Sequence, residues 1–218
     1  MNIVEFQDVT FATNKHYNSL QNINFQLKKG EKALLFASND SGVIEFFRVM
    51  LGFENAFSGI IQYKGIDIKK LKYKAANILY IPKNLVFFEK KSLEYNIKYF
   101  IKLRERNKGK VEEIFENIIN KYDFQVFLNN KVKDLSAIDR IKLCFARSDF
   151  RDIDLILIED IFEDLLNSEQ QLIVRLLKDF IKNHGSASLI WLSNNELIEH
   201  FSDFEKYILE FGSLSLMP

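Results

Sequence analysis

Apolar and polar residues alternate along the start of the chain, a pattern typical of β-strands with one buried face. Residues 3–11 show this alternation. The stretch 20–36 then gives a second strand, a turn at Lys28–Glu31 and the apolar run Ala33–Phe36. The turn chemistry and the spacing predict a hairpin followed by a buried strand.

A cluster of turn and capping residues, Ala37–Gly42, comes next and precedes a helical pattern from Val43 to Leu51. Residues 58–68 predict a short hairpin, and Ile78–Ile81 predict a strand that ends at the following proline. This part of the chain therefore indicates two further strand-forming stretches after the first helix.

The second half of the chain alternates helical stretches with apolar runs. It predicts a helical subdomain over the proline-free residues 90–134, helices over 136–149 and 168–183, buried strands at Leu155–Ile158 and Leu189–Leu192, a short helix over 195–201 and a last strand at Tyr207–Leu209. Strands that alternate with helices predict an α/β domain with a mainly parallel sheet. We expect one domain over residues 1–218.

Composition narrows the functional classes. Lys plus Arg number 30 and Asp plus Glu number 30, so the formal net charge is zero, which argues against nucleic-acid binding through bulk electrostatics. The single cysteine, Cys144, excludes an internal disulfide and a cysteine-clustered zinc site. No signal peptide or membrane-spanning run is visible, so we expect a cytoplasmic protein without direct membrane insertion, peripheral to a membrane only through a partner.

Short motifs follow one another in a fixed order along the chain. They are Gly30-Glu31-Lys32, Leu51-Gly52, Ser58-Gly59-Ile60, Gly65-Ile66-Asp67-Ile68, Ile78–Lys83, Phe87-Phe88, Ser92–Ile97, Leu135-Ser136, Phe145–Arg147 and Leu155–Asp160. This succession resembles the ATP-binding-cassette (ABC) ATPase domain over essentially the whole chain, and the stretch 58–97 is most similar to cassettes of membrane exporters.

The resemblance implies an α/β fold of the P-loop NTPase type. It implies a mainly parallel sheet core, an N-terminal antiparallel β subdomain and an inserted helical subdomain over residues 85–134. It also implies a membrane permease subunit or another ABC ATPase subunit as the partner, with a homodimer as an alternative.

The nucleotide-binding positions that the resemblance assigns to the phosphate loop depart from the family's pattern. Val43 stands where the family has the lysine that contacts the β- and γ-phosphates, and Ile44 replaces the hydroxyl residue that ligates magnesium. Asp40 puts a carboxylate where a glycine lets backbone N–H groups approach phosphate. The assigned loop positions are Ser38, Asn39, Asp40, Ser41, Gly42, Val43, Ile44 and Glu45.

The other family positions are altered as well. Lys83 replaces the glutamine after the Tyr-x-Pro strand, and Asn194 replaces the histidine that contacts the γ-phosphate. The signature keeps Ser136 but loses both glycines, and the Asp-Glu pair after the apolar strand is reversed to Glu159-Asp160. The adenine-stacking aromatic falls near Thr13, with Phe11 or Tyr17 as a partial substitute. The motif at the cassette junction becomes Glu163–Leu166.

Each altered position also has a purely structural interpretation. The phosphate loop is then a strand-to-helix turn whose polar residues, Asp40 and Ser41 among them, accept hydrogen bonds from the start of the helix. Ser136 is then a helix N-cap, and Glu159-Asp160 is an acidic strand end rather than an inverted pair of metal ligand and catalytic base.

An aromatic-rich segment, residues 85–100, is the predicted partner-binding surface. In the family this region helps to form the groove that receives a permease helix, and aromatic rings offer a large contact area at modest entropic cost. The alternative is that the rings fill the core of the helical subdomain. The residues concerned are Phe87, Phe88, Tyr95, Tyr99 and Phe100.

Three functions remain open. The first is a catalytically degenerate ABC ATP-binding subunit that regulates or supports a membrane complex. The second is an active but atypical ABC ATPase that uses Glu159 and Asp160. The third is a standalone protein-interaction module. We expect no metal and no cofactor, with ATP and magnesium retained only if residual binding survives.

Overall fold

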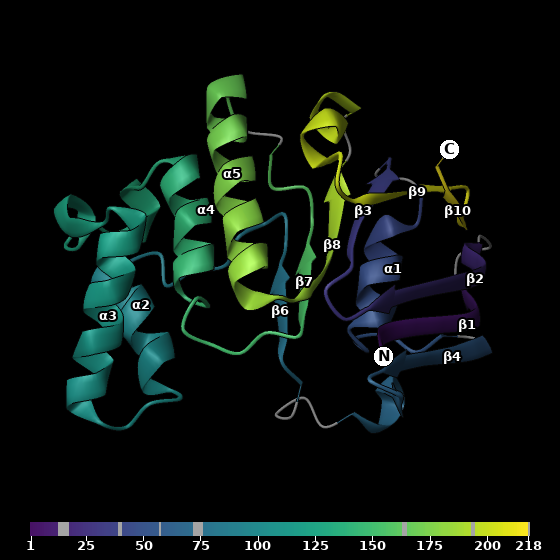
Figure 1. Ribbon diagram of the computed structural model, residues 1–218, viewed down its shortest axis with the longest axis horizontal. Helices are drawn as coiled ribbons and strands as arrows, with labels where there is room; N and C mark the ends of the chain where they lie inside the picture. Colours follow the sequence, from purple (N-terminus) through teal and green to yellow (C-terminus); the bar gives the residue numbers. More distant parts are fainter. Residues whose placement is uncertain are drawn as a thin grey trace. The chain divides into compact units, whose positions relative to one another are not determined.

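The computed structural model describes residues 1–12, 18–38, 41–56, 58–71, 76–162, 165–192 and 195–217. The chain folds into two compact units (Figure 1). The first unit comprises Met1–Tyr80, Ile153–Asp160 and His184–Pro218, and the second comprises Ile81–Asp152 and Ile161–Asn183. Each unit is therefore assembled from segments that are distant in the sequence.

A four-stranded antiparallel sheet forms the N-terminal part of the first unit. Its strands are β1 (Asn2–Ala12), β2 (Asn18–Lys28), β4 (Ser58–Tyr63) and β5 (Ile66–Asp67), in the order β2-β1-β4-β5. The predicted hairpin over 58–68 is confirmed by the pairing of β4 with β5. The N-terminal hairpin joins β1 to β2 and does not turn at Lys28–Glu31, because the strand after that turn enters a second sheet.

The second sheet is mainly parallel, as predicted. Its strands are β3 (Lys32–Ala37), β6 (Ile78–Ile81), β7 (Leu155–Ile158), β8 (Ala187–Leu192), β9 (Glu205–Glu210) and β10 (Ser213–Leu216), in the order β10-β9-β3-β8-β7-β6. Strand β3 runs parallel to both β8 and β9. Strand β9 is not the last strand, because β10 pairs with it in antiparallel fashion.

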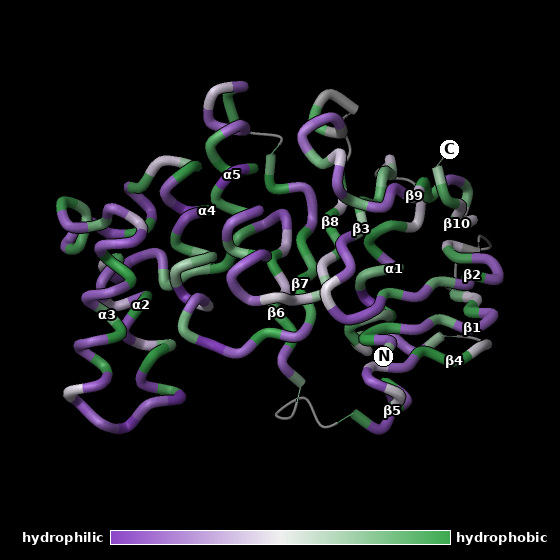
Figure 2. The backbone as a smooth tube through the Cα atoms, in the orientation of Figure 1, coloured by the Kyte–Doolittle hydropathy of each residue, from purple (hydrophilic) through white to green (hydrophobic). Residues whose placement is uncertain are grey.

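The core of the first unit is built from the inner faces of its strands and from helix α1 (Val43–Met50). Most residues of β7 and β8 are apolar (Figure 2). Both strands are buried over their whole length. Phe46 of α1 stacks on Phe6 of β1 with ring centroids 4.9 Å apart. Aromatic side chains thus join the first helix to the antiparallel sheet.

The second unit is helical. Its helices are α2 (Leu93–Lys102), α3 (Lys108–Tyr122), α4 (Ala137–Ala146) and α5 (Asn167–His184), the last reaching the unit boundary, with short 3-10 turns at Gln125–Phe127 and Val132–Asp134. Ser92 and Asn107 cap α2 and α3 by accepting a backbone N–H with their side chains. Phe145 stacks on Phe180 at 5.3 Å and links α4 to α5. The first unit contains 3-10 turns at Ile68–Lys70 and Asn195–Phe201.

Within the described residues, none of the helices combines the length and the apolar character needed to cross a bilayer.

Candidate functional site

Three adjacent parallel strands end at one edge of the second sheet. Phe36 of β3 pairs with Leu192 of β8, and Ile158 of β7 pairs with Ile190. Ligands of open parallel sheets bind beyond the carboxyl ends of their strands. The described residues that directly follow β3 and β7, Ser38 and Glu159-Asp160, therefore lie at this edge. Among the predicted site residues, Asn39, Asp40 and Asn194 lie outside the described residues, as do Thr13, Glu163 and Asp164.

The end of the phosphate loop packs against the rest of the unit. Gly42, the N-cap of α1, has φ 92°, and a Cβ at this position would lie 1.9 Å from the carbonyl oxygen of Ser19 in β2. Only glycine fits both this conformation and this contact. The backbone N–H of Gly212, in the β9–β10 turn, donates to the carbonyl oxygen of Ser41 at 3.2 Å. Protein backbone thus contacts the loop from two sides.

Ser41 itself is buried, and its hydroxyl donates to the carbonyl oxygen of Ser38 at 2.7 Å. The sequence predicted that the side chain of Asp40, Ser41 or Ser38 accepts hydrogen bonds from the start of the helix. In the structure the Ser41 hydroxyl is a donor within its own loop. The loop is therefore held by an internal serine bond next to the start of α1.

The first turn of α1 carries no basic side chain where a phosphate ligand would need a positive charge. The side chain of Val43 has no exposed surface and belongs to the core of the first unit. Ile44 is 43% exposed, and Glu45 is half-buried. A helix N-terminus carries a partial positive charge of about half an elementary unit, but here the side chains of this turn add no cation to it.

Trp191 forms a hydrogen bond with the backbone at the N-terminal end of the phosphate loop. Its indole N–H donates to the carbonyl oxygen of Ala37 at 3.0 Å, and both residues are buried. Nothing in the local sequence indicated this contact, because it joins two strands that lie far apart along the chain. It fixes the point at which β3 becomes the phosphate loop.

The two acidic residues after β7 are almost entirely buried, with 9% of Glu159 and 3% of Asp160 exposed. The hydroxyl of Tyr80, from β6, donates a hydrogen bond to Oε1 of Glu159. Burial, this hydrogen bond and the charge of Glu159 raise the pKa of Tyr80 above its usual value, so the hydroxyl keeps its proton. Tyr80 is not among the site residues predicted from the sequence.

Among the residues that the structure describes, those at this edge do not form a site that fits magnesium. In the described part of the chain, no three side chains of the types His, Cys, Asp or Glu gather as a metal site. Ile44 provides no oxygen where the family has a hydroxyl, and one oxygen of Glu159 already accepts the Tyr80 hydrogen bond. Divalent cations of this type require several oxygen ligands.

Lys83 and Ser136 both belong to the second unit. Ser136 is the N-cap of α4: its Oγ accepts the backbone N–H of Asp139 at 3.2 Å and donates to the Asp139 carboxylate at 2.6 Å. The N-cap interpretation of Ser136 is thus confirmed. Lys83 lines a pocket of about 290 Å³ together with Asn84, Leu85, Ala137, Arg140, Ile141, Ile161 and Leu165.

The five predicted partner-binding aromatics divide into two groups. Phe88, Tyr95 and Tyr99 are 39%, 41% and 38% exposed. Tyr99 meets Phe88 edge-on at 4.8 Å and stacks on Tyr95 at 6.0 Å, so these rings form one continuous surface.

Phe87 and Phe100 are half-buried and lie beneath cations. The guanidinium of Arg147 lies over Phe87 at 4.5 Å and over Phe100 at 4.9 Å. These two rings therefore serve packing within the second unit, whereas the other three contribute exposed surface.

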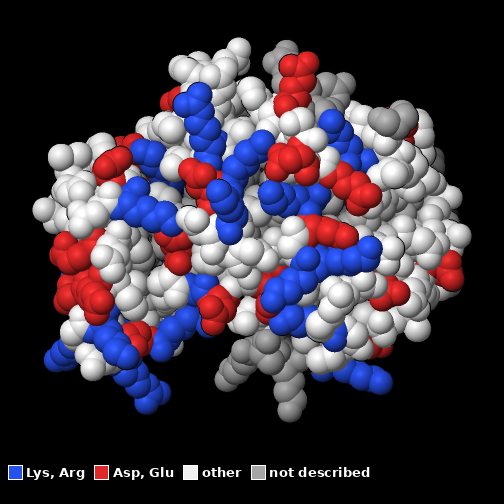
Figure 3. Space-filling model, in the orientation of Figure 1, with Lys and Arg blue, Asp and Glu red and all other residues white. Residues whose placement is uncertain are grey.

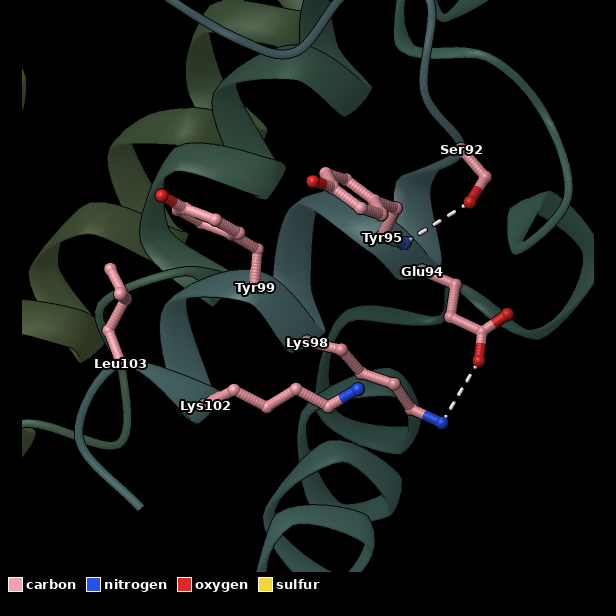
Figure 4. A pocket seen from close by; sticks show the side chains of 7 residues that line it. All are labelled: Ser92, Glu94, Tyr95, Lys98, Tyr99, Lys102 and Leu103. Carbon is pink, nitrogen blue, oxygen red and sulfur yellow. Dashed lines mark hydrogen bonds and ion pairs between the residues drawn. The ribbon is translucent and has the colours of Figure 1, made fainter. Parts of the chain in front are cut away.

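A groove of about 420 Å³ runs along the exposed face of α2 (Figure 4). All four side chains project from the same face of α2, with Tyr95 and Tyr99 along one edge of the groove and Lys98 and Lys102 along the other. Lys98 binds Glu94 at 2.9 Å and Glu112 at 2.6 Å, which fixes its position. The groove is lined by Ser92, Glu94, Tyr95, Lys98, Tyr99, Lys102 and Leu103. Elsewhere, acidic and basic side chains are interspersed on the face in view in Figure 3.

Comparison with known proteins gives the family. The sequence model of a family described as "ABC transporter" matches residues 20–162. The chain is 27% identical over 144 residues to the spermidine/putrescine import ATP-binding protein PotA of Mycoplasmopsis synoviae, covering 65% of this chain and 30% of that protein. It is 24% identical over 170 residues to the molybdate/tungstate import ATP-binding protein WtpC of Pyrococcus horikoshii, covering 78% and 49%.

A third relative is matched over most of its length. The lipoprotein-releasing system ATP-binding protein LolD of Buchnera aphidicola is 24% identical over 189 residues, which cover 84% of this chain and 83% of that protein. By contrast, the chain spans half or less of PotA and WtpC.

Solved structures agree on the fold. The cbiO1 protein of Clostridium perfringens, part of an ABC transporter complex, superposes with a TM-score of 0.85 at 14% identity, covering 99% of this chain and 87% of that one. A dimeric ATP-binding cassette in a post-hydrolysis state, bound to ADP and Pi, gives a TM-score of 0.78 at 16% identity and covers 99% of both chains. The predicted P-loop NTPase-like fold is confirmed.

Proposed function

The chain belongs to the ABC transporter family, and from this premise we propose that it is an ATP-binding-subunit-like member that has lost the family's nucleotide chemistry. It acts as a regulatory or structural partner in an ABC-type membrane complex. The observation that carries the proposal is the complete burial of Val43 in the core, at the position that resembles the phosphate-binding lysine.

Electrostatics at the start of α1 supports this proposal. The family's lysine would attract the β- and γ-phosphates, with roughly 4 kcal/mol between unit charges about 4 Å apart at an effective dielectric constant near 20. Val43 contributes none of this attraction, and Asp40 adds a negative charge to the loop sequence. The loop is therefore poor at holding a triphosphate.

The composite arrangement of the family strengthens the argument. The resemblance implies that each nucleotide site combines the phosphate loop of one subunit with the signature of the other. Here the phosphate loop lacks its lysine, and the signature lacks its glycines, with Ser136 already bonded to Asp139. Even a fully competent partner would then complete neither of the two sites.

The groove on α2 is the surface through which the chain would bind its permease. Its aromatic wall, Tyr95 and Tyr99, offers an apolar contact, and Lys102 adds a positive charge on the opposite side. Its best occupant is an amphipathic helix that places an apolar side chain on the two rings and a carboxylate near Lys102. A membrane subunit supplies such a helix at its cytoplasmic side in the family that the sequence resembles.

The transported substrate and the direction of transport are not assigned. PotA and WtpC are named for import of spermidine/putrescine and of molybdate/tungstate, whereas LolD is named for a lipoprotein-releasing system. The relatives' substrates therefore differ from one another. The similarity of residues 58–97 to exporter cassettes stays a prediction.

ATP hydrolysis by the purified chain tests the proposal. We expect no phosphate release above the buffer control at saturating ATP and magnesium, because each missing charge-stabilising group costs about 100-fold or more in rate. The control is the Asp160→Asn variant, which removes the remaining candidate base. Turnover by the unmodified chain that Asp160→Asn abolishes would establish the atypical ATPase instead.

A further inference from the structure

Tyr80 and Glu159 meet at the edge of the sheet where the family resemblance implies a magnesium ion. Tyr80 lies near the end of β6, and Glu159 follows directly after β7, the neighbouring strand. The tyrosine hydroxyl donates to Oε1 of the carboxylate, which is 9% exposed. The contact lies entirely within the first unit.

A buried carboxylate needs compensation for the water that it has lost. Either a cation or hydrogen-bond donors can provide it, and a donor to a charged acceptor is worth more than one to a neutral acceptor. The sequence has an acidic residue at this position, as the family does. Ile44, however, stands at the position where the family has the hydroxyl residue that ligates magnesium. The retained acid thus requires a compensating group of a different kind.

We propose that the Tyr80 hydroxyl takes the place of a divalent cation at Glu159, so that the carboxylate is a structural hydrogen-bond acceptor that fastens β6 to the end of β7 without metal. The inference deepens the proposed loss of nucleotide chemistry and rests on it. It assigns Tyr80 a positioning role and makes Glu159 a part of the fold.

The surroundings of Tyr80 hold the hydroxyl in place. Its ring lies 6.4 Å from the ring of Phe47 on α1 and meets Phe53 edge-on at 6.5 Å. Arg48, in the same helix, binds Glu54 at 2.6 Å, which anchors the segment that carries Phe53. The tyrosine is therefore fixed by α1 and its following loop, and it does not depend on any ligand for its position.

The test is the melting temperature of the full chain without nucleotide. The protein is first freed of metal with EDTA, and is then measured in magnesium chloride, in manganese chloride and in sodium chloride of equal ionic strength. We expect the wild-type melting temperature to be the same in all of these salts. Tyr80→Phe should melt several degrees lower, because the carboxylate loses a donor. Glu159→Gln keeps a carbonyl acceptor and should melt closer to the wild type than Tyr80→Phe does.

Tyr207→Phe is the matched control. It removes a similar tyrosine–glutamate hydrogen bond of 2.8 Å, but its acceptor, Glu205, is exposed, so little change in melting temperature is expected. A wild-type protein that magnesium stabilises, with the effect lost in Glu159→Gln, would overturn the proposal and identify a metal site. Equal melting of Tyr80→Phe and wild type would also overturn it. Because no nucleotide is present, neither result depends on whether the chain hydrolyses ATP.

Discussion

The indole nitrogen of Trp191 lies 3.0 Å from the carbonyl oxygen of Ala37, and this hydrogen bond ties the last residue of β3 to the neighbouring strand β8. Ala37 is 1% exposed, so water does not reach the same carbonyl group easily. A side chain of one central strand thus fixes where the other strand ends and the phosphate loop begins.

Trp191→Phe should lower the free energy of unfolding by about 2–4 kcal/mol. The replacement leaves a buried carbonyl group without this donor and removes part of a packed ring, and both changes destabilise. Urea unfolding followed by far-ultraviolet circular dichroism measures the change, since Trp191 is also the only tryptophan and its fluorescence is lost in the variant. An unchanged urea midpoint would contradict a structural role for this bond.

Val43→Lys should destabilise the chain by about 1–3 kcal/mol, because an ammonium group would replace an apolar side chain that has no exposed surface. The matched change at the next position, Ile44→Ser, should stay within about 0.5 kcal/mol, since Ile44 is 43% exposed. Thermal unfolding of both variants compares them. If Val43→Lys were as stable as Ile44→Ser, the side chain of residue 43 would not point into the core.

Asp154 should make stability depend on pH in the acid range. Burial alone would raise its pKa, but hydrogen bonds from Lys64 and Tyr63, with the charge of Lys64, lower it below the ordinary value. Because the folded-state pKa is depressed, the contribution is present at neutral pH and disappears as pH falls below about 4. Asp154→Asn should therefore lower the free energy of unfolding by about 1–2 kcal/mol at neutral pH and by almost nothing in acid. This range takes into account that the carboxylate is partly exposed and screened by solvent.

The measurement for Asp154 is the melting temperature of wild type and Asp154→Asn across this pH range. Asp203→Asn is the control, because its carboxylate, 3.2 Å from the Lys32 ammonium, belongs to a side chain that is 49% exposed and should contribute little. A difference between Asp154→Asn and wild type that persisted unchanged into acid would rule out an electrostatic origin.

Tyr99→Ala should weaken association with the membrane partner by about tenfold or more, because an aromatic anchor in a groove commonly contributes over 1 kcal/mol. The measurement is the fraction of the chain that sediments with membrane vesicles of its native cells, as a function of chain concentration. Val126→Ala is the control, since Val126 is 78% exposed in the same unit and lies outside the groove. Equal losses for the two variants would move the binding surface away from α2.

Elements with a strong apolar pattern were predicted closely from the sequence. Leu155–Ile158 was expected as a buried strand, and β7 has these same bounds, because four consecutive apolar residues fit a parallel strand covered on both faces. Strand β10 was missed, since Ser213–Leu216 has no buried residue and its pairing with β9 is made by backbone groups alone. Its signal was the Phe211-Gly212 turn, where both residues have positive φ.

The candidate site was predictable only in part. The order of the motifs predicted the edge of the sheet at which the site lies. The contacts of Tyr80 and Trp191 could not be predicted, because they depend on strands that meet only after folding. The sequence pattern did not predict which aromatic side chains are exposed, because Phe87 and Phe100 are covered by Arg147, which lies 60 and 47 positions later in the chain. Residue types alone do not determine such long-range pairs.

The place of β3 between β8 and β9 has a consequence for the newly synthesised protein. About 150 residues separate the end of β3 at Ala37 from the start of β8 at Ala187. At about 5–20 residues per second, a ribosome needs roughly 8 to 30 seconds to make that stretch. During this time the apolar strand that leads into the phosphate loop has neither of its final neighbours. A nascent chain of this kind depends on chaperones or on temporary contacts to keep that strand from aggregating until its C-terminal strands emerge.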